Sequence, residues 1–99
     1  MEHHVYFWLK DEYRNSVNRL AFEQGLSSLF EIVQVAGGRW AVPAKVAARA
    51  VIDQSWDYAL TMQFASVEDH DLYQVEAIHQ IFIESFGDWW AQVQVKDLA

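Results

Sequence analysis

The strongest constraint on the fold is a short segment near the N-terminus that is apolar on both of its sides. Residues 4–9 are β-branched and aromatic and so predict a β-strand. Side chains of a strand alternate between two faces, here Val5, Phe7 and Leu9 on one and Tyr6 and Trp8 on the other. A strand of this kind is usually covered on both sides. We therefore expect structure on each face of this strand.

The next segments predict a helix and a second strand. Asn15 or Ser16 can cap a helix, and apolar residues follow at helical spacing over about four turns. These residues are Phe22, Leu26, Leu29, Phe30 and Val33. Residues 33–42 are strand-like, with a bulge or bend at Gly37-Gly38. Pro43 ends the strand, and the connection to Ser55 has room for a helical turn near Ala47.

The second half predicts a strand, a helical region and a last strand. Residues 56–64 alternate, with one apolar face made of Trp56, Tyr58, Leu60, Met62 and Phe64. Ser66 and Asp69 have the spacing of a helix cap. The helical region that follows has one apolar stripe, formed by Ile78, Ile81, Phe82, Ser85, Phe86 and Trp89. Gly87 marks its end, and residues 90–97 form the last strand.

The order β-α-β-β-α-β predicts one α+β domain over residues 1–99 with a ferredoxin-like fold. In this fold a four-stranded antiparallel sheet carries two helices on one face. The other face of the first strand then needs a cover, and fifteen aromatic residues are many for a small isolated monomer. The economical cover is a second copy, packed sheet to sheet as a dimeric α/β barrel. We therefore expect a homodimer.

Composition excludes several classes of function. Fourteen acidic residues against seven scattered basic ones make nucleic acid an improbable partner. The absence of cysteine excludes disulfides, thiolate nucleophiles and thiolate metal sites. No apolar run approaches the ~20 residues of a membrane span, and the N-terminal segment lacks the layout of a signal peptide. We expect a cytoplasmic protein with neither nucleic acid nor membrane as partner.

Three short motifs, in this order, resemble the stress-responsive A/B barrel family, also called Dabb. The first is the strand that begins at His4, and the second is Pro43-Ala44 followed by the run from Val51 to Tyr58. The third is Tyr73 followed by residues 79–82, His-Gln-Ile-Phe. The resemblance covers nearly the whole chain. It implies the dimeric α/β barrel, while members of the family are similar in fold but not in activity.

The resemblance also implies candidate catalytic residues. One member is a polyketide cyclase that closes a ring by aldol-type chemistry without a cofactor, using a tyrosine, a histidine and a second, assisting histidine. The matching positions here are Tyr73, His79 and His4. An imidazole with a pKa near ~6.5 can take a proton from an activated carbon at neutral pH. A phenol can donate a hydrogen bond to the oxygen where charge develops.

The chain departs from the family at its most characteristic motif. The family commonly has His-Pro-x-His, and residues 76–79 here are Glu-Ala-Ile-His. In one unbroken helix Tyr73 and His79 would point roughly 240° apart. They could converge only if the helix breaks or bends between them, which Ala77 does not force. Glu76 would lie beside His79 on such a helix and could hold or charge its imidazole.

Two classes of function follow. The first is a non-catalytic barrel that binds a small apolar or aromatic molecule, with a site formed by Tyr6, Trp8, Glu76, Phe82 and Phe86. The alternative is a cofactor-free acid–base enzyme, with His79 as base, Tyr73 as donor and His4 assisting. A weaker alternative, from fold analogy alone, is a cofactor-independent monooxygenase.

Simpler explanations of the same residues remain open. His79 alone on an apolar helix face is more often a packing residue than a catalyst, and Tyr73 can pack likewise. His70 lies between two aspartates and is expected on a solvated helix surface. His3, His4 and His79 have no spacing typical of metal ligands. We therefore expect no metal and no cofactor.

Overall fold

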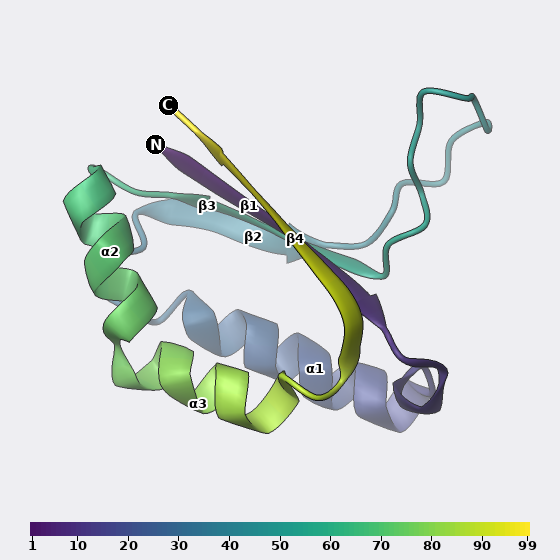
Figure 1. The fold of residues 1–99 in the computed structure, drawn as a ribbon, viewed down its shortest axis with the longest axis horizontal. Coiled ribbons are helices and arrows are strands. Elements are labelled where there is room, and N and C mark those ends of the chain that lie inside the picture. The colour runs from purple at the N-terminus through teal and green to yellow at the C-terminus, as the bar shows by residue number, and fades with distance from the viewer.

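The computed structural model describes residues 1–99, which form one antiparallel sheet with helices on a single face (Figure 1). The predicted element order is confirmed, except that the second helical region consists of two helices. The elements are β1 (Glu2–Leu9), the short 3₁₀ helix η1 (Asp11–Tyr13), α1 (Ser16–Leu29), β2 (Gly37–Ala41), β3 (Tyr58–Gln63), α2 (Val67–Val75), α3 (Ala77–Phe86) and β4 (Trp90–Leu98).

The sheet has the strand order β2-β3-β1-β4, and every neighbouring pair is antiparallel. β1 is therefore an inner strand, and Val5 at its middle pairs with Leu60 of β3 and with Val95 of β4. This is the predicted ferredoxin-like topology. In Figure 1 the two chain ends lie side by side at one end of the sheet, α1 and α3 lie below it, and α2 runs down beside its left end.

The two faces of β1 have different surroundings. Side chains at odd positions point toward the helices and are buried, namely His3, Val5, Phe7 and Leu9. Val5, Phe7 and Leu9 pack in the main core together with Phe22, Leu26 and Leu29 of α1 and Phe82 of α3. Side chains at even positions lie on the face that carries no helix, which we call the open face: Glu2 is exposed there, and His4, Tyr6 and Trp8 are half-buried. The expectation that helices cover one face only is confirmed.

Both predicted helix caps are confirmed. The side chain of Asn15 accepts a hydrogen bond from the backbone N–H of Asn18 at 2.9 Å. The hydroxyl of Ser66 accepts one from the backbone N–H of Asp69 at 3.1 Å. Each bond satisfies a donor that the first turn of a helix leaves without a partner.

Residues 30–57 differ most from the predicted pattern. Phe30 to Val35 form successive turns, closed by bonds such as Val35 N–H to the Ile32 carbonyl at 3.0 Å. Val33 is therefore outside α1, with 86% of its surface exposed, and β2 begins only at Gly37. No helical turn forms near Ala47. Residues 42–57 instead make a long loop that projects from the body (Figure 1).

Trp56 does not belong to the apolar face of β3. The strand starts at Tyr58, and Trp56 packs edge-on against Tyr6 of the open face, with ring centroids 5.4 Å apart. The cause is Asp57, whose carboxylate accepts hydrogen bonds from the backbone N–H of Leu9 at 2.8 Å and from Arg19 at 3.0 Å. The Leu9 N–H thus bonds to the Asp57 side chain and not to a backbone carbonyl. The regular strand pairing, and with it the alternation of side chains between the two faces, therefore does not extend to Trp56.

The longest helix, α1, has 14 residues. None of the helices combines the length and the apolar character that crossing a membrane would require.

The predicted irregularity at the glycine pair lies at Gly38, whose φ of +119° suits glycine and few other residues. A Cβ there would lie 1.8 Å from the Thr61 carbonyl oxygen. We expect Gly38→Ala to lower the free energy of unfolding by more than about 2 kcal/mol in urea titrations. The matched control is Gly37→Ala, whose Cβ meets only the flexible end of Gln63. Equal stability of the two variants would contradict this account.

Candidate functional site

The second helical region is interrupted at Glu76. Its backbone is extended, with φ −65° and ψ 147°, and it separates α2 from α3. The side-chain amide of Gln80 donates to the carbonyl of Gln74 at 3.0 Å, and the Glu76 carboxylate accepts from Gln34 Nε2 at 3.2 Å. These bonds hold the break and satisfy a carbonyl near the end of α2. The helical region is therefore broken between Tyr73 and His79, although no proline is present.

The break brings Tyr73 and His79 together. Their ring centroids lie 4.8 Å apart with an interplanar angle of 74°, an edge-to-face contact. In a continuous helix these side chains would diverge, whereas here α2 presents Tyr73 and α3 presents His79 to the same space. Tyr73 is 2% exposed.

Both residues line one cavity of about 200 Å³ between the sheet and the two helices. Ten of its thirteen lining residues are hydrophobic, and the polar remainder is His3, Gln74 and His79. Val93 and Val95 of the edge strand β4 line it while 43% and 50% exposed, so the cavity opens along that edge. An apolar pocket with a few convergent polar groups is typical of small-molecule sites.

The histidine of β1 that reaches this cavity is His3, not His4. His3 is 4% exposed, and its ring centroid lies 6.0 Å from that of Tyr73. His4 points to the open face, where its Nε2 lies 3.8 Å from a carboxylate oxygen of Glu2. The structure therefore does not bring His4 together with Tyr73 and His79, because adjacent residues of a strand lie on opposite faces.

His70 was expected on a solvated surface and is buried instead, at 8% exposure. It lies one turn before Tyr73 on the same face of α2. Its ring packs against His3, with centroids 4.8 Å apart, and edge-on against Phe64 at 5.5 Å. The flanking aspartates are exposed or half-exposed at the helix surface while His70 turns inward.

Of the other candidate site residues in the helical region, only one lines the cavity. Phe82 is buried and lines the cavity as predicted. Phe86 does not line it and packs against Phe22 of α1, with ring centroids 5.4 Å apart. Glu76 neither lines it nor holds His79, because its carboxylate binds Gln34. The Nδ1 atom of His79 is buried and has no hydrogen-bond partner.

Burial sets the protonation of the pair. It lowers the pKa of His79 below its ordinary value of 6.5, and the nearby imidazoles of His3 and His70 lower it further. Burial alone raises the pKa of Tyr73. At neutral pH the imidazole is therefore neutral and the phenol keeps its proton. These are the forms that a base and a hydrogen-bond donor require.

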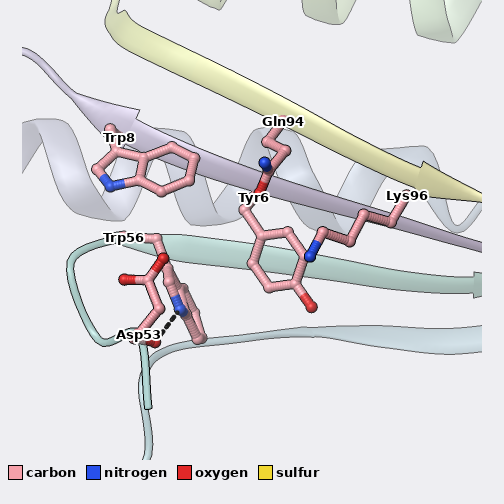
Figure 2. A pocket seen from close by; sticks show the side chains of 6 residues that line it. All are labelled: Tyr6, Trp8, Asp53, Trp56, Gln94 and Lys96. Atoms are coloured by element: carbon pink, nitrogen blue, oxygen red, sulfur yellow. Dashed lines mark hydrogen bonds between the residues drawn. The ribbon is translucent and has the colours of Figure 1, made fainter. Parts of the chain in front are cut away.

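The remaining ligand-binding candidates, Tyr6 and Trp8, lie on the open face. They line a shallow depression of about 250 Å³ with Asp53, Trp56, Gln94 and Lys96 (Figure 2). The indole N–H of Trp56 donates to the Asp53 carbonyl at 2.9 Å, and that of Trp8 donates to the Ser55 hydroxyl at 3.0 Å. These bonds fasten the end of the 42–57 loop beside the open face.

Sequence reasoning missed His3, His70 and Gln74 as residues around the cavity. Strand alternation indicated the position of His3, because His3 lies on the same face of the strand as Val5 and Phe7. Helical spacing contained a signal for His70, three residues before Tyr73. Neither pattern alone predicts a cavity, because the cavity also depends on β4 and on the break at Glu76.

Comparison with protein families gives one assignment. The sequence model of the Stress Responsive A/B Barrel Domain, Dabb, matches residues 1–99. This match confirms the resemblance identified from the sequence. A search of curated proteins finds no match.

Solved structures share the fold at low sequence identity. One is a Dabb family protein with a ferredoxin-like fold from Mesorhizobium loti, with a TM-score of 0.80 and 19% identity over 99% of this chain and 93% of that one. A dimeric ferredoxin-like protein of unknown function from Thermobifida fusca has a TM-score of 0.80 and 15% identity over 99% and 88%. A hydroxynitrile lyase from Passiflora edulis has a TM-score of 0.77 and 17% identity over 96% and 87%.

The buried histidines predict that acid weakens the fold. The pKa values of His3 and His79 are lower in the folded protein than 6.5, so below that pH the unfolded chain binds more protons. Their contribution to stability is present above pH 6.5 and is lost as the pH falls through the folded-state values. We expect a lower urea midpoint at pH 5 than at pH 7.5, and a smaller difference in His79→Gln. An unchanged midpoint in the wild type would refute the burial argument.

Proposed function

Because the chain belongs to the stress responsive A/B barrel domain family, we propose that it acts as a homodimer on a small, largely apolar carbonyl compound. In this proposal the compound binds in the cavity between the sheet and the helices. His79 removes a proton from it, and Tyr73 stabilises the negative charge that develops on its oxygen. The observation that carries the proposal is the contact of the two rings at the wall of one apolar cavity.

The cavity of about 200 Å³ is small for a drug-sized molecule and suits a compact ring or short chain. Gln74 and His3 add polar atoms at its wall. A ligand with an apolar body and one carbonyl matches this lining.

The proposed chemistry is proton removal next to that carbonyl. The neutral imidazole of His79 accepts a proton from the adjacent carbon, and the electron pair of the C–H bond moves toward the carbonyl oxygen. The Tyr73 hydroxyl donates a hydrogen bond to this oxygen as it becomes negative. The enolate can then add to an electrophile or regain its proton. The hydroxynitrile lyase of similar fold indicates that the scaffold supports catalysis in one relative.

The proposed dimer covers the open face. Tyr6, Trp8 and Trp56 form an aromatic surface there, and no helix of the chain covers it. The similar protein from Thermobifida fusca is described as dimeric. Packing two such faces together buries aromatic rings at about 25 cal/mol per Å² of apolar surface. It also supplies the second cover that β1 needs.

For the dimer, we expect sedimentation at micromolar concentration to give twice the chain mass of 11.5 kDa. Trp8→Glu places a charge in the proposed interface, and this variant should sediment as a monomer. Val17→Glu, on the exposed surface of α1, is the matched control and should remain a dimer. A monomeric wild type at this concentration overturns the dimer.

For the chemistry, the test is deuterium exchange at the acidic carbon of small aromatic ketones, followed by NMR. We expect the wild type to accelerate exchange, and His79→Ala to lose about 100-fold or more of that acceleration. Tyr73→Phe should keep ligand binding and lose rate. His4→Ala, on the open face, should retain both.

Thermal-shift measurements on the same compounds separate binding from turnover. Stabilisation that depends on His79 without any exchange would support a binding protein and end the catalytic half of the proposal. Exchange that survives in His79→Ala would end it as well. An absence of both stabilisation and exchange across the panel would contradict the ligand class.

A further inference from the structure

We propose that His3, His70 and Asp97 form a binding site for a divalent transition-metal ion, with zinc as the best match. The three residues come from β1, α2 and β4. Each offers one ligand atom, and these atoms all lie within 4.8 Å of one another. The trio considered from the sequence, His3, His4 and His79, does not assemble, because His4 lies on the open face.

The donor set fits the ion. Zinc binds imidazole nitrogen and carboxylate oxygen at about 2.0–2.2 Å, which places ligands of one ion roughly 3.4 Å apart. The present separations therefore require side-chain movements of about 1–1.5 Å. The Asp97 side chain is 43% exposed and has room for such a rotation. Two histidines and one carboxylate leave a fourth position for water.

The surroundings favour an ion over a purely structural cluster. His3 and His70 are both buried, with ring centroids 4.8 Å apart. The two imidazoles make no hydrogen bond to each other and would repel when protonated. The Nε2 atom of His70 instead lies 3.3 Å from Nε2 of Gln74. A metal between them would be coordinated by one nitrogen of each ring. It would replace the contact of His70 with Gln74 and the 2.5 Å hydrogen bond between His3 Nδ1 and Asp97 Oδ1.

A second carboxylate supports the same arrangement. The Nδ1 atom of His70 lies 3.3 Å from a carboxylate oxygen of Asp71. Metal-binding histidines usually give their other ring N–H to such a carboxylate, which fixes the ring and its tautomer. The net charge of −7 also favours a cation over an anion. The site is closed by the core on one side and reaches solvent through Asp97.

The site goes beyond the proposed function and does not depend on it. His3 contributes to both, since it also lines the cavity. An ion held by His3 would thus lie at the edge of that cavity. Metal binding is measurable without any substrate, so failure of this inference and failure of the proton-transfer proposal are separate results.

The test is calorimetric titration of zinc into protein without a histidine tag, stripped of metal by EDTA. We expect one ion per chain, and cobalt should give the visible absorption of a tetrahedral ion. Asp97→Asn and His70→Ala should weaken zinc binding by at least about tenfold. His4→Ala, a histidine of the same strand on the opposite face, should leave the affinity unchanged.

Three outcomes would overturn the proposal. They are no zinc binding by the wild type, equal loss in His4→Ala, and wild-type affinity in Asp97→Asn. Because His70 is buried, circular dichroism must show that His70→Ala is folded. Asp97→Asn changes an exposed end of β4 and keeps the test decisive even if His70→Ala does not fold.

Discussion

At Glu76 the backbone leaves the helical conformation, and the arrangement of the whole cavity follows from that residue. α2 turns His70 and Tyr73 toward the sheet, while α3 starts in a new direction and brings His79 and Phe82 to the same space. Gln34 and Gln80 hold the break with side-chain hydrogen bonds. Two glutamines thus hold the break here in the absence of a proline, one of them in the turns after α1.

The inner strand β1 separates two surfaces with different properties. Its odd positions form the floor of the cavity, and its even positions form the aromatic open face. A strand has a period of two, so one step along the chain decides which surface a residue serves. His3 and His4 differ by that one step. The proposed dimer surface and the proposed ligand cavity can therefore change independently along a single strand.

The sequence predicted the fold well because the fold depends on local patterns. Alternation located the strands, and Asn15 and Ser66 located two helix starts. The break at Glu76 escaped prediction because apolar spacing continues through it, and the bond from Gln34 spans 42 residues. The position of Trp56 was missed for a similar reason, since the neighbouring Asp57 carboxylate is held by hydrogen bonds from the Leu9 N–H and Arg19. Tertiary hydrogen bonds of this kind leave no periodic signal.

Burial connects the two kinds of chemistry proposed for the cavity. It favours neutral imidazole at His3 and His79, and the positive charge of any one histidine would disfavour protonation of its neighbours. Proton abstraction and metal binding both need an imidazole lone pair, so the same cluster suits both. A bound cation at His3 would lower the proton affinity of His79 further, because like charges repel in a poorly solvated site. Metal binding would then change the proton affinity of His79, the proposed base, without contacting it.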